Sequence, residues 1–105
     1  MSKTKSQVKT CVERLKVLAD ETRLRVIHQI MEKPLSVSEI NQVLKIDQSL
    51  LSHHLKILRD SGLIMTERIG KSIFYSTSKS IISSSNKQIV DLGCCQINFK
   101  EGTTV

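Results

Sequence analysis

The residues of this chain best suited to chemistry are its three cysteines. Cys11 lies near the N-terminus, whereas Cys94 and Cys95 are adjacent near the C-terminus. An odd number of thiols does not make a disulfide framework, and thiols kept reduced in a cytosol are available to a metal, a metalloid or an oxidant. The adjacent pair lacks the Cys-x-x-Cys spacing of redox enzymes and has no general base beside it. These features favour thiol binding or oxidation over enzymatic catalysis.

A second group of polar residues could bind duplex DNA. In the segment 47–60, apolar residues recur at helical spacing and leave hydrogen-bonding side chains on the opposite face, where they can meet base edges. His54 lies beside the apolar stripe, so it is either a further DNA contact or a half-buried histidine. Adjacent histidines point about 100° apart on a helix and are poorly placed to share a metal ion. We expect base contacts from Gln48, Ser49, Ser52, His53 and Lys56, with His54 as a further candidate.

The chain after this helix supplies groups for phosphates. Two strand patterns, at 63–68 and 72–76, flank a tight turn that contains Gly70 and Lys71. Arg59 at the end of the helix and Lys71 in the turn can reach phosphates, while Gly70 lets the backbone approach a minor groove. A helix-turn-helix followed by such a hairpin is a winged helix, which reads duplex DNA.

The elements that position these residues are mostly helices. Val8, Val12, Leu15 and Leu18 recur at helical spacing and predict a first helix at about 6–19. Three further helices are predicted from capping residues, and they begin at Asp20, at Ser36 in a capping box with Glu39, and at Asp47.

A weaker helix pattern follows the hairpin. It runs from Ser78 to Gly93 and leads into a tail, from Cys94 onward, that has no clear periodicity. We therefore expect a mainly α winged helix-turn-helix fold with about five helices and a two-stranded wing. It should form a single domain over residues 1–105, with N- and C-terminal dimerisation helices and a cysteine-bearing C-terminal tail.

Composition agrees with a DNA-binding protein. Sixteen Lys and Arg against ten Asp and Glu give a net charge of +6, which suits a polyanion. Only three aromatic residues are available as stacking platforms for single-stranded bases, so duplex DNA is favoured over RNA. The chain shows neither a membrane-spanning run nor a signal peptide, and we expect a cytoplasmic protein with no membrane partner. A domain of this size gains burial by pairing, so we expect a dimer.

Three segments are distinctive in combination: Leu18-Ala-Asp-Glu-Thr-Arg-Leu-Arg25, Leu51-Ser-His-His-Leu-Lys-Ile-Leu-Arg-Asp-Ser-Gly-Leu63 and Arg68-Ile-Gly-Lys-Ser-Ile-Phe-Tyr75. Together they resemble the ArsR/SmtB family of transcriptional repressors. The resemblance implies a symmetric homodimer, paired through its first and last helices, on a palindromic operator of double-stranded DNA. It also implies that DNA binding needs no cofactor and that an inducer releases the protein.

The chain departs from this family at both familiar inducer sites. Many members have paired cysteines in the third helix, whereas the matching stretch here carries Ser36 and Ser38. A second family site uses Asp and His ligands on the final helix for zinc, but the segment 79–92 has no His and only Asp91 as a carboxylate. The resemblance sets the first and last helices side by side. The remaining thiols, Cys11 with Cys94 and Cys95, could therefore converge within a subunit or between two.

Three thiolates around one centre suit trivalent arsenic or antimony, which form three sulfur bonds, whereas zinc generally takes four ligands. We therefore expect a dimeric repressor that arsenite or antimonite releases by binding Cys11, Cys94 and Cys95. Two alternatives stay open: a redox or persulfide sensor, in which Cys11 is the better disulfide partner because adjacent cysteines bridge only with strain, or a sensor of zinc or cadmium. Cys11 could also be a small core residue beside an incidental cysteine pair.

Overall fold

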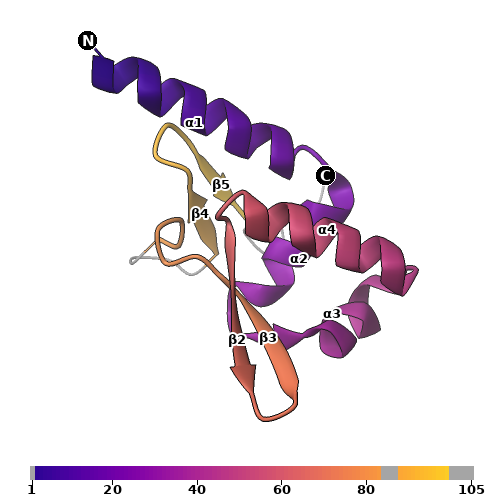
Figure 1. Cartoon of the computed structure of the whole chain (residues 1–105). Coiled ribbons are helices and arrows are strands. Elements are labelled where there is room, and N and C mark those ends of the chain that lie inside the picture. Colours follow the sequence, from indigo (N-terminus) through magenta and orange to yellow (C-terminus); the bar gives the residue numbers. More distant parts are fainter. Residues whose placement is uncertain (1, 84–87, 100–105) are drawn as a thin grey trace.

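The computed structural model describes residues 2–83 and 88–99. Within them the chain forms four helices and two small antiparallel sheets (Figure 1). The helices are α1 (Ser2–Leu18), α2 (Glu21–Ile30), α3 (Val37–Leu44) and α4 (Gln48–Asp60). The strands are β1 (Leu35–Ser36), β2 (Ile64–Ile69), β3 (Ser72–Thr77), β4 (Ile89–Asp91) and β5 (Gln96–Asn98). The expected fold class, mainly α with a winged helix-turn-helix, is confirmed.

Side-chain caps begin three of the helices, as the sequence predicts. The Asp20 carboxylate accepts a hydrogen bond of 3.0 Å from the backbone N–H of Arg23 at the start of α2. At α3, Ser36 and Glu39 form the reciprocal capping box. The Asp47 carboxylate accepts from the backbone N–H of Ser49 at 2.9 Å and begins α4. These caps satisfy N–H groups that a helix leaves unpaired, and they fix where the recognition helix begins.

The three-stranded sheet has the order β1-β3-β2 and ties the wing to the helix-turn-helix. Ile69 pairs with Ser72, so Gly70 and Lys71 form the turn of the β2–β3 hairpin, and Gly70 has the positive φ of +64° that such turns require. On the other side of β3, Ser36 pairs with Phe74. Because Ser36 also caps α3, the base of the wing and the start of α3 are held together.

The hydrophobic core draws side chains from all four helices and from both sheets; Val26, Ile27, Ile40, Leu51, Leu58 and Val90 are among its fully buried members. The predicted stripe on α1 is only partly used. Leu18 is buried, whereas Val8, Val12 and Leu15 are 53%, 42% and 40% exposed. An apolar row therefore lies open along α1. No helix in the described part of the chain is long and apolar enough to cross a membrane.

The prediction of a final helix between Ser78 and Gly93 is wrong for the residues that the structure describes. The segment contains turns, then β4, which pairs with β5 as a hairpin, and residues 84–87 lie outside the described part. The β-branched residues of this segment, such as Ile89 and Val90, favour extended backbone because their stiff side chains pack well on a sheet. Ile82 bridges to Val90, and Gly93 has φ +95° in the turn. The described residues thus have four helices rather than five, and a hairpin replaces the expected C-terminal dimerisation helix.

Candidate nucleic-acid interface and cysteine site

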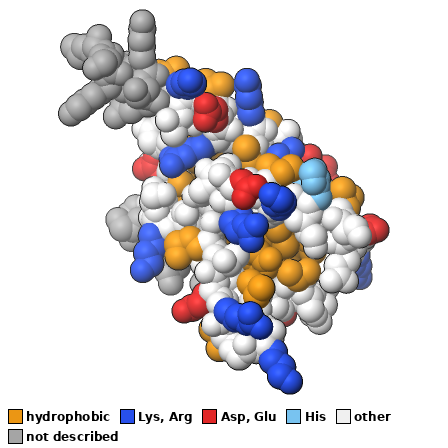
Figure 2. Space-filling model, in the orientation of Figure 1, with side chains coloured by type: hydrophobic (Ala, Val, Ile, Leu, Met, Phe, Trp, Pro, Cys, Tyr) orange, Lys and Arg blue, Asp and Glu red, His pale blue; other side chains and the backbone are white. Residues whose placement is uncertain are grey.

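Helix α4 and the β2–β3 hairpin present most of the predicted DNA-binding residues to solvent. Figure 2 shows Lys and Arg side chains spread over one face of the molecule, and the hairpin projects away from α1 (Figure 1). The exposed predicted contacts are Gln48, Ser49, Ser52, His53, Lys56 and Arg59 on α4, with Gly70 and Lys71 at the tip of the hairpin.

His54 is placed differently, and its prediction as a DNA contact needs correction. It is 9% exposed and lies on the buried face of α4 together with Leu51 and Leu58. Its Nδ1 has no hydrogen-bond partner among the described residues. The backbone N–H of Arg23 lowers the pKa of Asp20; burial opposes this shift, and the charges of Arg23 and His54 reinforce it. His54 therefore belongs to the contact between α2 and α4.

Asp60 pairs with two of the predicted DNA-binding cations, Lys56 and Arg59. Lys56 Nζ lies 3.0 Å from one carboxylate oxygen of Asp60, and Arg59 Nε lies 4.0 Å from the other. All three side chains are more than half exposed, so these ion pairs are weak and open to competition. Helical spacing places Asp60 four residues after Lys56, a pairing that sequence reasoning missed here.

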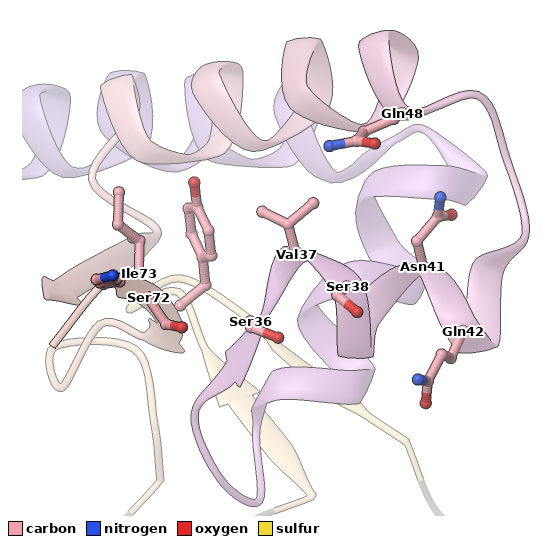
Figure 3. A pocket seen from close by; sticks show the side chains of 10 residues that line it. Ser36, Val37, Ser38, Asn41, Gln42, Gln48, Ser72 and Ile73 are labelled. Atoms are coloured by element: carbon pink, nitrogen blue, oxygen red, sulfur yellow. The ribbon is translucent and has the colours of Figure 1, made fainter. Parts of the chain in front are cut away.

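A groove separates the helix-turn-helix from the wing (Figure 3). Its volume is about 650 Å³, and its walls come from α3, the start of α4 and β3. Gln48 and Lys71, both predicted DNA contacts, line it together with Ser38, Gln42 and Tyr75, which sequence reasoning missed. Their place in the groove depends on the pairing of β1 with β3, which brings α3 beside the wing. No local pattern in the sequence specifies that pairing.

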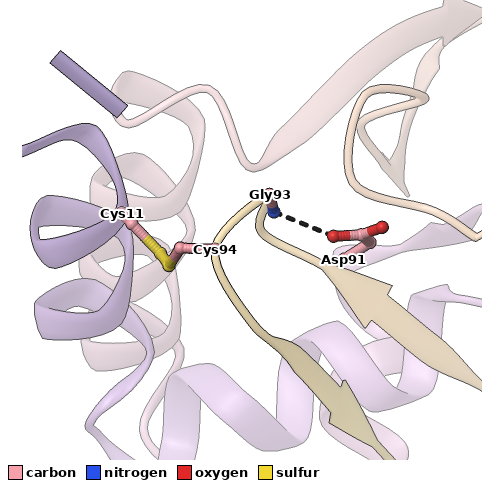
Figure 4. The surroundings of a disulfide bond; sticks show 4 residues. All are labelled: Cys11, Asp91, Gly93 and Cys94. Atoms are coloured by element: carbon pink, nitrogen blue, oxygen red, sulfur yellow. Dashed lines mark hydrogen bonds between the residues drawn. A yellow bond between two sulfur atoms is a disulfide. The ribbon is translucent and has the colours of Figure 1, made fainter. Parts of the chain in front are cut away.

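The three cysteines meet at the other end of the molecule. Cys11, which is 2% exposed on α1, forms a disulfide with Cys94, with 6.2 Å between the two Cα atoms (Figure 4). Cys95 is the free thiol, and the three sulfur atoms all lie within 4.8 Å of one another. The three sulfur atoms thus converge within one subunit, and the turn between β4 and β5 carries the C-terminal pair, which the sequence placed in a tail without periodicity.

Local hydrogen bonds hold the turn that carries Cys94 and Cys95. The backbone N–H of Leu92 donates to the carbonyl of Cys95 at 2.9 Å. One oxygen of the Asp91 carboxylate accepts from the backbone N–H of Gly93 at 2.8 Å (Figure 4). Beyond the turn, Phe99 stacks on His28 of α2 with 4.7 Å between ring centroids. The two thiols are therefore presented to α1 by an ordered turn.

Comparisons with known proteins agree with this geometry. A sequence model of the family described as "Bacterial regulatory protein, arsR family" matches residues 20–66. The chain is 34% identical over 80 residues to the transcriptional activator HlyU of Vibrio cholerae, an alignment that covers 76% of this chain and 74% of HlyU. This chain belongs to the ArsR family. It is a DNA-binding transcriptional regulator with a winged-helix fold.

Two further proteins are similar to this ArsR-family chain. The chain is 34% identical over 77 residues to the arsenical resistance operon repressor of Bacillus subtilis, covering 71% of this chain and 73% of the repressor. The solved structure of reduced HlyU from Vibrio cholerae has a TM-score of 0.70 and 32% identity, and covers 76% of this chain and 84% of that one. The similar proteins thus include one named for arsenicals and one described by its redox state.

The residues of the cysteine site allow two kinds of thiol chemistry that exclude each other. With all three cysteines reduced, the site would offer three thiolates, which are the ligands that thiophilic ions prefer. With Cys11 and Cys94 joined, only Cys95 keeps a thiol. Ligand binding and disulfide formation therefore compete for the same two sulfur atoms.

Proposed function

We propose that this ArsR-family protein is a homodimeric repressor that binds a palindromic operator and is released by arsenite or antimonite. The observation that carries this proposal is the group of three sulfur atoms, of Cys11, Cys94 and Cys95, within 4.8 Å of one another. Trivalent arsenic and antimony are soft and take three thiolate ligands, so this donor set suits them. No His, Asp or Glu joins the group among the described residues, and zinc would lack its usual fourth protein ligand.

The open face of α1 supports the dimer. Val8, Val12 and Leu15 form an exposed apolar row that a second copy of α1 would bury. Cys11 lies on the same helix, buried against the β4–β5 hairpin. A ligand held by Cys11 and the hairpin would therefore contact the helix that joins the two subunits and could shift its position. By linkage, the ligand weakens DNA binding only as far as it favours the DNA-free conformation.

Fluorescence anisotropy on a duplex from the protein's own upstream region tests this proposal. The reduced protein should bind the duplex and be released by about one equivalent of arsenite per subunit. The Cys94→Ser/Cys95→Ser variant should bind with the same affinity and ignore arsenite, while Ser80→Ala, an exposed change outside the site, should behave as wild type. Release of the double cysteine variant by arsenite would overturn the proposal.

A second candidate is a thiol-redox regulator, and the disulfide between Cys11 and Cys94 favours it. In this case an oxidant or a polysulfide converts two thiols into a disulfide or polysulfide bridge, and the bridge changes DNA affinity. Mass spectrometry and anisotropy after peroxide or polysulfide treatment distinguish the two candidates. If oxidation releases the protein from DNA and arsenite does not, the redox sensor replaces the metalloid sensor. If only zinc or cadmium releases the protein, both candidates are wrong.

A further inference from the structure

We infer that the groove between α3, α4 and β3 holds one sugar-phosphate strand of the bound DNA, mainly through uncharged hydrogen-bond donors. This inference rests on the DNA-binding function and extends it to residues outside the recognition face. The groove has about 650 Å³ of volume, enough for a stretch of backbone rather than a single ion (Figure 3).

The position of the groove identifies its occupant. A recognition helix such as α4 enters the major groove, and a wing meets the neighbouring minor groove. The strand that separates those two DNA grooves must then pass between α4 and the β2–β3 hairpin. The groove lies at this position, with Gln48 of α4 on one side and Lys71 and Ser72 of the hairpin on the other.

The polar groups in the groove fall into two sets. Ser36 and Asn41 are committed to the fold, because Ser36 caps α3 and the Asn41 side chain both donates to and accepts from the backbone of Ile46 at 2.9 Å. Ser38 and Gln42 are exposed and make no side-chain hydrogen bond within residues 2–83 and 88–99. A hydroxyl and an amide are thus left free to donate to phosphate oxygens.

Tyr75 extends this path toward the cations of α4. It lines both the large groove and a smaller hollow of about 120 Å³ whose other walls include Ser52, Lys56 and Arg59. The pairing of Tyr75 with Leu35 fixes its backbone, and its hydroxyl has no partner in the described part of the chain. A strand lying along both hollows would meet neutral donors in the middle and cations toward the ends.

Uncharged contacts leave a measurable signature. Counterion release makes each Lys or Arg contact to a phosphate steepen the salt dependence of DNA binding, whereas a neutral donor adds affinity without adding to the slope. Loss of a base contact, in contrast, weakens binding selectively for the operator. Substitutions of the groove residues should therefore lower the affinity for all duplexes equally and leave the salt slope unchanged.

The test uses anisotropy on operator and random duplexes over a range of salt concentrations, with the variants Ser38→Ala/Gln42→Ala and Tyr75→Phe. Each should bind both duplexes about three- to tenfold more weakly, as expected for one or two lost neutral hydrogen bonds, with an unchanged slope. Lys71→Gln should instead reduce the slope by about one, and Ser80→Ala should match wild type. Thermal melts of all variants should coincide with wild type, because the removed groups carry no bond within the described fold.

Wild-type affinity in both groove variants would overturn the inference, and so would a loss confined to the operator or a change in salt slope. The proposed function would survive each of these results, because it requires only that the wild-type protein bind DNA and respond at its thiols. Failure of arsenite to release the wild-type protein would refute the metalloid sensor and leave the groove assignment standing.

Discussion

The DNA-binding face and the cysteine site hold their functional groups in opposite ways. On α4 and the wing, long polar side chains extend into solvent, and the fold fixes only the backbone from which they start. At the cysteine site, short side chains meet between a buried position on α1 and an ordered turn, so the backbone, the burial of Cys11 and the disulfide leave the sulfur atoms little freedom. Changes on the first surface should therefore act gradually and additively. Changes at the cysteine site should alter the stability of the fold and the response to the inducer in an all-or-none way.

The largest effect should come from breaking the disulfide. The Cys11–Cys94 bond joins residues 83 positions apart, and a loop of that length lowers the entropy of the unfolded chain enough to stabilise the fold by about 4.5 kcal/mol. Urea unfolding should show this difference between oxidised and reduced protein. Each variant is compared with itself in the two redox states. Cys95→Ser should keep the stability difference between oxidised and reduced protein because Cys95 lies outside the disulfide, whereas Cys11→Ser should lose it. Equal midpoints with and without reductant in Cys95→Ser would contradict the prediction.

Oxidation should also abolish the response to arsenite. The disulfide removes two of the three sulfur ligands and leaves Cys95 alone. If arsenite lowers operator affinity of the reduced protein by the usual coupling of about 5- to 150-fold, the oxidised protein should show no decrease. Titration of both forms in the anisotropy assay measures this, with Cys95→Ser as a control that loses the response in either state. An undiminished response of the oxidised form would show that arsenite binds elsewhere.

The same contrast explains what the sequence could predict. The recognition face depends on local signals: caps at Asp20, Ser36 and Asp47, helical spacing in α4, and a glycine in the wing turn. Each of these acts over a few residues, so it can be recognised without knowing the tertiary structure. His54 was ambiguous because it borders the apolar stripe, and only the tertiary structure shows that it is buried.

For the cysteine site, the sequence could predict which residues take part but not how the chain brings them together. Its thiols are 83 residues apart, and their meeting depends on how the C-terminal segment folds back onto α1. That segment carries a weak helical pattern together with β-branched residues that suit strands, and the tertiary contacts of Val90 and the β4–β5 pairing decide between them. The groove was missed for a similar reason, because β1 is two residues long and gives no strand signal of its own.

A smaller effect is expected at Asp20, which begins the helix that lies between the two regions. Asp20→Ala should cost about 1 kcal/mol by removing the cap of α2, whereas Asp20→Asn keeps a capping oxygen and should cost less. Hydrogen bonding from Arg23 holds the pKa of Asp20 below its usual value of 3.8. A lowered pKa gives stability that is fully present above 3.8 and is lost as the pH falls through the folded-state value.

Urea unfolding of wild type, Asp20→Ala and Asp20→Asn at neutral pH and near pH 3 tests both statements, since pH 3 lies below the usual pKa of 3.8. The advantage of wild type over Asp20→Asn should shrink at the lower pH. A constant difference at the two pH values would mean that the charge of Asp20 contributes nothing to the fold.

The smallest effect should be an increase in DNA affinity. Asp60 places its carboxylate against Lys56 and near Arg59, and DNA phosphates must compete with it for both cations. Asp60→Asn should therefore tighten binding about two- to fivefold on operator and random duplexes alike, in keeping with the modest strength of exposed ion pairs. Salt should reduce the gain, because screening weakens the repulsion between Asp60 and the phosphates.

Glu32→Gln is the matched control for this change, since it removes the same charge at an exposed position that lines neither hollow of the DNA face. Equal gains in both variants would reflect net charge alone, and only a larger gain in Asp60→Asn would assign the effect to the ion pairs of α4. Arsenite release should be unchanged in Asp60→Asn. A variant that tightened DNA binding and also altered the arsenite response would show that the two regions are not separable, and would refute the contrast between a gradual surface and a switch.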